Sequence, residues 1–395
     1  MTVPYGCQSR DHGKHSSTNG KAVLAWSASC GVRGASPSVS FWDRAIRRAG
    51  FGALRWSGWA AAAEHRIGAR GAILRFQRVT PAQGGAFHPL RAQAVTPAFL
   101  DRSIAALRRW GYDIVAIGEV PGRLAETGAR ARIAVLTFDG GCRDLVDHAW
   151  PVLRRHGAPF TAYVSSSGPD GLALMAAPAI ELMVRRQTRI GLMVGSRERR
   201  LTCETVADKR YVFEVIAAHL QSIPDQDVAD AALRDLCRRY GVDLAALCRA
   251  HCLTWRDLQQ LAADPLATIG SATVTGAALS RRNAARAEQE MRMGRAVLEA
   301  ALGRPVPHFA FPGGLAETVG RRDVIAAAAC GFATAVTAGH RPLMAGDELR
   351  LHALPRLSID GRYATLGYLR TQLSGWGARP LPADAAATGP DATSM

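Results

Sequence analysis

The sequence lacks the features that assign many proteins to a class at once. No run of about 18 or more apolar residues occurs, so we expect no membrane-spanning helix. The eight cysteines are irregularly spaced and include no Cys-x-x-Cys pair, which argues against a disulfide framework in a chain of 395 residues. We therefore expect a globular protein of the reducing cytoplasm rather than a secreted one.

Negative charge is also scarce. The chain has 33 acidic residues against 49 Lys and Arg, which gives a net charge of +16. A protein this basic attracts phosphate, nucleic acid and anionic lipid. The arginines are nevertheless scattered through a chain rich in Ala, Arg and Gly, with no dense Lys/Arg tract and no RNA-binding aromatic signature. We expect no nucleic-acid partner.

The two ends of the chain differ in composition from its centre. Residues 1–40 are rich in Ser, Gly and Lys and residues 377–395 in Ala, Pro and Asp, so we expect a disordered extension and a disordered tail. Between 41 and 66, apolar residues recur at helical spacing among arginines and tryptophans. This basic amphipathic helix is predicted to dock on the following domain or to lie on an anionic membrane surface, and docking is favoured.

From residue 67 to 376 the sequence alternates between short apolar runs and amphipathic stretches, which favours a parallel sheet with crossover helices. Residues 168–253 interrupt this alternation with a mostly helical pattern and a basic patch at Arg197–Arg200, and we interpret them as an insertion. The predicted strands are 71–79, 113–117, 132–140, 160–166, 267–274, 307–314 and 332–338, and the predicted helices are 96–110, 144–156, one capped by Thr254, 281–302 and 324–330.

The most informative segment is Thr137-Phe138-Asp139-Gly140-Gly141, at the predicted carboxyl end of a buried strand. Barrel enzymes place their catalytic residues at such strand ends. Taken alone, however, one Asp before two glycines is equally a turn without chemistry, so this segment by itself does not indicate an activity.

This segment and three others resemble motifs of the polysaccharide deacetylase family, also called the NodB-homology or carbohydrate esterase family 4 group. The family's first motif, Thr-Phe-Asp-Asp-Gly, matches 137–141. Its second, Ile-Gly followed by His-Ser/Thr-x-x-His, matches 269–276. Its third ends in a Pro-aromatic-Gly turn, which matches 311–314, and 354–356 reads Leu-Pro-Arg as in many members. The resemblance implies an α/β fold, a distorted (β/α)7 TIM-like barrel.

The resemblance also assigns roles to individual positions. In the family the first Asp of the first motif is the general base, and the second Asp and the two His bind a divalent metal, usually zinc, that activates water. The base position is Asp139 here, but the three metal positions are Gly140, Ala272 and Gly276. Zinc needs N, O or S donors, which these side chains lack. We therefore expect a vestigial base and no cofactor.

By the same resemblance, Arg356 is expected to form an ion pair with Asp139. His352 is a candidate for the family's late catalytic acid, although an ordinary histidine at the edge of the core is the commoner case. The residues expected to line the sugar cleft are Phe311, Pro312 and Gly313, the last in place of the family's aromatic. Other potential metal donors without a recognisable spacing are His88, His308, His340 and Cys142; Cys248 and Cys252 are expected to share a helix face as small apolar residues.

Three functions remain open on the sequence. The first, favoured because all three ligand positions are replaced, is a catalytically degenerate deacetylase homologue that binds acetylated glycan or a partner enzyme. The second is an active N-deacetylase of chitooligosaccharides or a cell-surface polysaccharide with a non-standard metal site, which His or Cys side chains converging near Asp139 would favour. The third is a membrane-peripheral adaptor that uses residues 41–66.

Overall fold

The computed structural model describes residues 69–82, 84–126, 132–315 and 318–375. The predicted N-terminal extension 1–40, the predicted helix 41–66 and the predicted tail 377–395 lie outside these residues. Within the described part, no helix is long and apolar enough to cross a bilayer.

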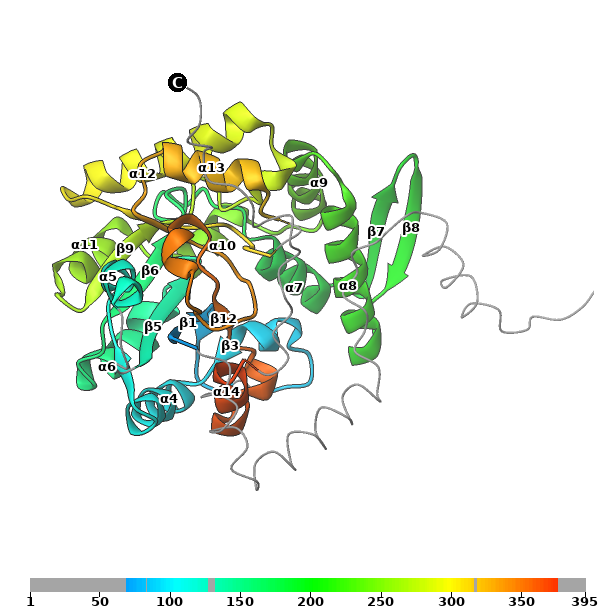
Figure 1. Cartoon of the computed structure of the whole chain (residues 1–395). Coiled ribbons are helices and arrows are strands. Elements are labelled where there is room, and N and C mark those ends of the chain that lie inside the picture. Colours follow the sequence, from blue (N-terminus) through cyan, green and yellow to red (C-terminus); the bar gives the residue numbers. More distant parts are fainter. Residues whose placement is uncertain (1–68, 83, 127–131, 316–317, 376–395) are drawn as a thin grey trace, which may run out of the picture. The chain divides into compact units, whose positions relative to one another are not determined.

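Parallel strands form one curved sheet (Figure 1). Along the sheet the order is β11-β10-β9-β6-β5-β1-β12, and β4 (Tyr112–Ile114) pairs with β5 beside this path. The chain around Leu354 pairs with Val336 of β11 just before β12 pairs with β1, so this segment joins the two ends of the sheet. This topology confirms the predicted distorted (β/α)7 barrel. The strands on the path are β1 (Gly71–Phe76), β5 (Arg132–Asp139), β6 (Phe160–Val164), β9 (Ala267–Ser271), β10 (His308–Ala310), β11 (Thr334–Val336) and β12 (Leu357–Ser358).

Side chains alternate between two environments along each strand, as the pleat requires. In β5, Leu136 and Phe138 belong to the core between the sheet and the helices, whereas Val135 belongs to a second core inside the barrel. Asp139 lies four residues after Val135, an even number, so the two side chains point to the same face of the sheet. The period of two therefore places its carboxylate on the inner face, at the carboxyl end of the strand.

Helices pack against the outer face of the sheet (Figure 1). Helix α4 (Pro97–Arg109) begins at Thr96, whose Oγ1 accepts a hydrogen bond from Phe99 N at 3.1 Å. Helix α12 (Ala284–Leu302) ends at Gly303, whose φ of 64° suits a residue without Cβ. The other helices of the barrel are α5 (Val120–Ala125), α6 (Trp150–Arg155), α11 (Trp255–Ala263), α13 (Arg321–Ala329) and α14 (Leu366–Leu373).

The segment predicted as a helical insertion has a core of its own, which includes Ile180, Leu192 and Leu236. It also contains an antiparallel hairpin that the sequence reading missed, and the basic patch Arg197–Arg200 lies on its second strand. The hairpin was missed because its second strand, RERRLT, has only one apolar residue and so shows no alternation, although Gly195, with φ of 61°, and Ser196 form a two-residue loop typical of hairpins. Its elements are α7 (Ala176–Arg186), β7 (Arg189–Val194), β8 (Arg197–Thr202), α8 (Val206–Ser222), α9 (Gln226–Arg239) and α10 (Leu244–His251).

Two predicted elements are interrupted. The predicted strand 71–79 breaks at Gln77, after which β2 (Arg78–Val79) pairs with β3 (Ala94–Val95). The predicted helix 144–156 is a π-helix over Leu145–Ala149 before α6 begins. Pro151 lacks the N–H that an α-helical bond at this turn requires, which accounts for the wider turn before it.

Candidate functional site

The predicted motifs meet at one cavity of about 270 Å³, at the carboxyl ends of β5, β9 and β10. We call it the Asp139 pocket. Parallel strands bring their carboxyl ends to one rim of a barrel, so segments 130 residues apart in the chain become neighbours there. The motif residues that line the pocket are Asp139, Gly140, Gly141, Ala272, Thr275, Gly276, Ala310, Phe311, Pro312 and Gly313, together with Arg75, Gln77, Cys142, Ser165, Leu174, Met175 and Cys252.

The Asp139 carboxylate forms a two-point ion pair with Arg356, the pair expected from the resemblance. Arg356 Nη1 donates to Oδ1 at 2.6 Å, and Nη2 donates to Oδ2 at 2.9 Å. The guanidinium also donates to Thr137 Oγ1 and to the Thr337 carbonyl, so four of its five N–H groups have a partner. The Arg356 side chain is 0% exposed. The Asp139 carboxylate offsets the cost of removing the Arg356 charge from water.

A second guanidinium reaches the same carboxylate from β1. Arg75 Nε donates to Asp139 Oδ2 at 2.6 Å, and both side chains are largely buried. Burial alone raises the pKa of an aspartate, but the positive charges of Arg356 and Arg75 outweigh it and lower the pKa of Asp139 below its ordinary value. Asp139 is therefore ionised at neutral pH and has a hydrogen-bonded guanidinium on each oxygen.

Tyr163 of β6 packs against this ion pair inside the barrel. Its ring lies 5.5 Å from the Arg356 guanidinium carbon, a cation–π arrangement. A Cβ on Gly270 would lie 2.5 Å from this ring, so the glycine of the Ile-Gly pair leaves the space that Tyr163 fills. Gly270 thus serves the packing inside the barrel, independently of any catalytic role.

The three positions that hold metal in the resembled family have no donor side chain here, and their backbone suits small residues. Gly140 and Gly276 have φ of 91° and 73°, a region that side chains with Cβ rarely adopt. A Cβ on Gly276 would also lie 2.8 Å from Ser165 Oγ. Throughout the described part of the chain, no group of three or more His, Cys, Asp or Glu is arranged to hold a metal. The residues of this pocket do not fit the family's metal.

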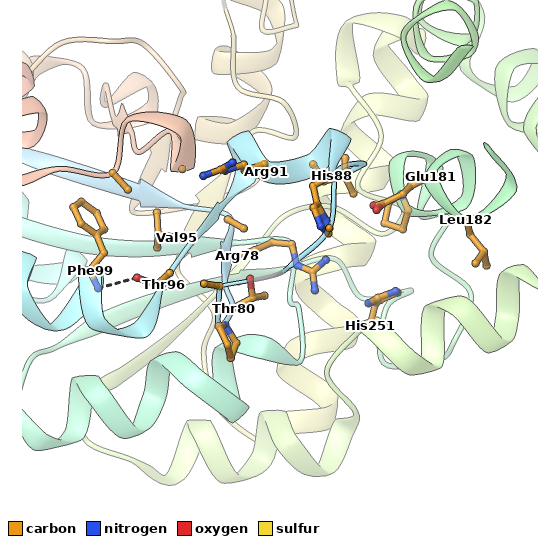
Figure 2. Close-up of a pocket in the computed structure, with 18 of the residues that line it drawn as sticks. Arg78, Thr80, His88, Arg91, Val95, Thr96, Phe99, Glu181, Leu182 and His251 are labelled. Atoms are coloured by element: carbon orange, nitrogen blue, oxygen red, sulfur yellow. Dashed lines mark hydrogen bonds between the residues drawn. The ribbon is translucent and has the colours of Figure 1, made fainter. Parts of the chain in front are cut away.

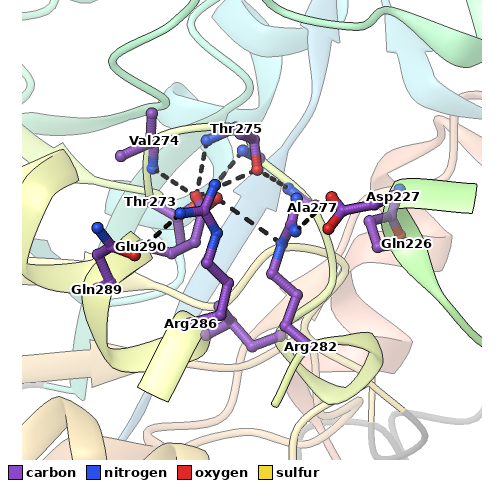
Figure 3. A network of polar contacts seen from close by, with 12 residues as sticks. Gln226, Asp227, Thr273, Val274, Thr275, Ala277, Arg282, Arg286, Gln289 and Glu290 are labelled. Atoms are coloured by element: carbon purple, nitrogen blue, oxygen red, sulfur yellow. Dashed lines mark hydrogen bonds and ion pairs between the residues drawn. The ribbon is translucent and has the colours of Figure 1, made fainter. Parts of the chain in front are cut away.

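The loop that carries Ala272 and Gly276 is nevertheless firmly held (Figure 3). Glu290 of α12 is 3% exposed, and its Oε2 accepts hydrogen bonds from the backbone N–H of Val274 and Thr275 and from Thr275 Oγ1, at 2.9 to 3.1 Å. Arg282 lies between Glu290 and Asp227 of α9, at 3.7 and 2.8 Å. One buried carboxylate therefore fixes the loop, and the arginine joins that loop to the insertion.

Packing against α12 strains the same loop. Thr273 is the one non-glycine among the described residues with positive φ, 67°, and it is fully buried. Its Oγ1 accepts a hydrogen bond from Gly276 N at 3.0 Å. Gly294 of α12 lies so close that a Cβ there would be 2.5 Å from the Thr273 carbonyl carbon. A β-branched residue in this conformation costs free energy, which the surrounding contacts must offset.

Sulfur atoms form one wall of the pocket. Cys252 Sγ lies 3.6 Å from Cys248 Sγ and 3.7 Å from Met175 Sδ. Cys248 lies in α10, whereas Cys252 follows the helix in extended backbone, so the two do not share a helix face; both are buried and free. Burial raises the pKa of Cys142 to about 12 and raises that of Cys252 as well, so both are thiols at neutral pH.

The structure does not bring every predicted residue to the pocket. His352 lies in the 3-10 turn Leu351–Ala353, and its Nε2 is 2.7 Å from the Phe332 carbonyl, which precedes β11. That position is at the opposite end of the barrel, so His352 is not placed to act as an acid on Asp139. His308 is also distant, because it begins β10, where its Nδ1 is 2.8 Å from Thr334 Oγ1 and burial lowers its pKa to about 4. Phe311 does line the pocket, although its ring packs edge-on against Phe309 in the core.

The sequence analysis did not predict two residues of the site, Arg75 and Glu290. Arg75 gave a usable signal, since it is the one charge in the otherwise apolar strand GAILRF, two residues after the inward-facing Ile73. Nothing in the sequence marks Glu290, because a glutamate in a long amphipathic helix is ordinarily solvent-exposed.

No protein-family model matches the chain, and no curated protein matches it. Solved structures that are similar include the deacetylase PplD of Streptococcus pyogenes in complex with acetate (15% identity, 77% of this chain and 99% of that chain, TM-score 0.49). A polysaccharide deacetylase from Bacillus cereus has 14% identity over 76% of this chain and 68% of its own, with a TM-score of 0.46. IcaB from Ammonifex degensii has 16% identity over 79% and 98%, with a TM-score of 0.46.

One prediction is corrected by this comparison. The prediction that the chain takes no cofactor is wrong, because the similar structures are deacetylases and the resemblance assigns that family a divalent metal. The finding that stands is narrower and concerns the Asp139 pocket alone. Its residues at the three ligand positions have no donor side chain, whatever the chain binds elsewhere.

Proposed function

We propose that this deacetylase-like barrel binds an acetylated glycan in the Asp139 pocket without hydrolysing it. The observation that carries the proposal is the state of Asp139, whose two oxygens each accept a hydrogen bond from a guanidinium. A general base works best when its pKa lies near the working pH, whereas the pKa of Asp139 is lowered. Gly140, Ala272 and Gly276 supply no group that would activate water in its place.

The shape and lining of the pocket support binding. It combines polar groups (Gln77, Ser165 and Thr275) with apolar ones (Leu174 and Met175), the mixture that orients a sugar while covering its acetyl group. The loop around Thr273 is fixed by Glu290, so the cavity is formed before a ligand arrives.

The test is a titration with acetylated chitotetraose, followed by calorimetry, together with an assay of acetate release in the presence of added zinc. We expect binding without acetate release above the buffer rate. Leu174→Trp, which fills the pocket, should weaken binding at least about tenfold, equivalent to about 1.4 kcal/mol. Leu172→Trp is the matched control, because Leu172 is 71% exposed and lies outside the pocket; it should change affinity less than about twofold.

Two results contradict the proposal. Acetate release that disappears in Asp139→Asn would make the chain an active deacetylase. Absence of binding, or equal effects of the two tryptophan variants, would remove the glycan from this pocket.

A further inference from the structure

A second and larger cavity adjoins the Asp139 pocket. Its volume is about 520 Å³, and Arg78, Leu90 and Pro178 line both cavities. Its walls come from β2, β3, the 3-10 turn Pro89–Gln93 and the start of α4 on one side, and from α7 and α10 of the insertion on the other (Figure 2). We call it the basic pocket.

The lining of the basic pocket is strongly positive. Four arginines contribute to it, against Glu181 as the single acidic residue of the lining. Two of the arginines are neutralised locally: Arg185 lies 2.5 Å from Glu181, and Arg78 lies 2.9 Å from Asp144 behind the wall. The other two are Arg91 and Arg102.

Arg91 and Arg102 are exposed, and no acidic side chain of the described ranges lies within ion-pair distance of either. Asp101, the neighbour of Arg102, is occupied by Arg155 and His156 instead. Both arginines therefore line the cavity, and neither guanidinium is in an ion pair with a described acidic side chain. Planar guanidinium groups bind carboxylate, sulfate and phosphate through paired hydrogen bonds.

The remaining lining suits a sugar rather than an isolated ion. Thr80 and Thr96 bring hydroxyls, His88 and His251 flank Arg78 in Figure 2, and Leu182 and Val95 bring apolar surface. A volume of about 520 Å³ is within the range of pockets for small organic ligands and far exceeds one phosphate.

From this geometry we propose that the basic pocket binds an anionic substituent (sulfate, phosphate or carboxylate) on a glycan whose neighbouring unit occupies the Asp139 pocket. The proposal rests on the function proposed above and adds the class of ligand. The shared residues at the boundary let one chain of sugars run from one cavity to the other, and Arg91 and Arg102 select the charged form.

The experiment compares acetylated chitotetraose with its 6-O-sulfated form by calorimetry at about 0.15 M ionic strength, where charges more than about 8 Å apart are largely screened. We expect the sulfated form to bind at least tenfold more tightly. The double variant Arg91→Gln and Arg102→Gln should remove this gain, so that the two forms bind with the same affinity. Inorganic phosphate should compete more strongly with the sulfated form than with the neutral form.

The control is the double variant Arg109→Gln and Arg256→Gln. It removes the same charge from two exposed arginines, one of them on α4 like Arg102, and neither lines the basic pocket or the Asp139 pocket. This control should keep the tenfold gain. Equal losses in the two double variants would assign the gain to the overall charge of the chain and overturn the proposal.

Two further outcomes are decisive. In the first, sulfation brings no gain in affinity while the neutral sugar still binds and Leu174→Trp still weakens that binding. This result overturns the anionic subsite and leaves the proposed function standing. Competition by phosphate that persists in the Arg91→Gln and Arg102→Gln variant would place the anion in the Asp139 pocket, and the basic pocket would then have no role.

Discussion

At the scale of single residues, the centre of this barrel is a charge cluster, with one carboxylate between two arginines. Arg356 is fully buried and Arg75 nearly so, and both donate to Asp139. Desolvation of a charge is costly, so removal of one partner of such a cluster is far more damaging than removal of a surface pair. Asp139 therefore stabilises the fold, whatever ligand the pocket takes.

Asp139→Asn should lower the free energy of unfolding by about 3 kcal/mol at pH 7, because two guanidinium groups lose their counter-charge. The pKa of Asp139 is lowered in the folded state, so its contribution is present above the unfolded pKa of about 3.9 and is lost as pH falls through the folded value. Urea unfolding at several pH values should therefore show a difference that is constant from pH 5 to 7 and shrinks below about pH 4.

The control for that variant is Asp113→Asn, which breaks the exposed pair of Asp113 with Arg123 at 3.2 Å. Surface pairs contribute about 0 to 1 kcal/mol, so this variant should stay within that range. Similar losses in the two variants would show that the cluster around Asp139 has no special weight.

Cys142 gives a second prediction at this scale. Burial raises its pKa to about 12, so at pH 8 only about one thiol in 10⁴ is ionised. Alkylation by iodoacetamide, followed peptide by peptide with mass spectrometry, should be at least about a hundredfold slower in the native protein than in urea. A native rate within tenfold of the unfolded rate would mean that the thiol is exposed and ionised.

At the scale of elements, the loop after β9 and helix α12 form one unit. Glu290 binds the loop's N–H groups, and Gly294 one turn later lets the helix touch the Thr273 backbone. The loop thus keeps a defined shape where Ala272, Thr275 and Gly276 line the Asp139 pocket.

Gly294→Ala tests this unit through the sign of its effect. Alanine within a helix is ordinarily about 1 kcal/mol more favourable than glycine. At Gly294 the added Cβ would lie 2.5 Å from backbone of Thr273, so we expect a loss of about 1 to 3 kcal/mol in thermal or urea unfolding. In Gly122→Ala the Cβ of α5 meets nothing within 4 Å, and this variant should be neutral or stabilised. Stabilisation by both substitutions would refute the close contact.

At the scale of the whole molecule, the described chain contains a barrel and an insertion with separate apolar cores. Strands β5 and β6 of the barrel have partners on both sides, whereas β7 and β8 pair only with each other and most of β8 is exposed. The walls of the basic pocket come from both modules, so ligand selection depends on how the insertion meets the barrel.

Amide hydrogen exchange should follow this division. Local opening is easiest where backbone hydrogen bonds are exposed and few apolar contacts oppose it. We expect peptides of β5 and β6 to exchange at least tenfold more slowly than peptides of β7 and β8, measured by mass spectrometry at pH 7. Equal protection in the hairpin and the barrel would indicate that the whole chain opens as one unit.

The sequence by itself determined a parallel sheet with crossover helices and the strand end that carries Asp139. The reason is local: buried apolar runs, helix caps such as Thr96 and glycines such as Gly303 act within a few residues of themselves. The resemblance of the motifs to those of a known family added the closure of the sheet into a barrel and the pairing of Asp139 with Arg356. Only the tertiary structure decided that Arg75 shares that carboxylate, that Glu290 holds the loop at Thr273, that His352 faces away, and that Arg91 and Arg102 line a cavity. These facts depend on strand register and on packing between segments far apart in the chain, which no local pattern of residues encodes.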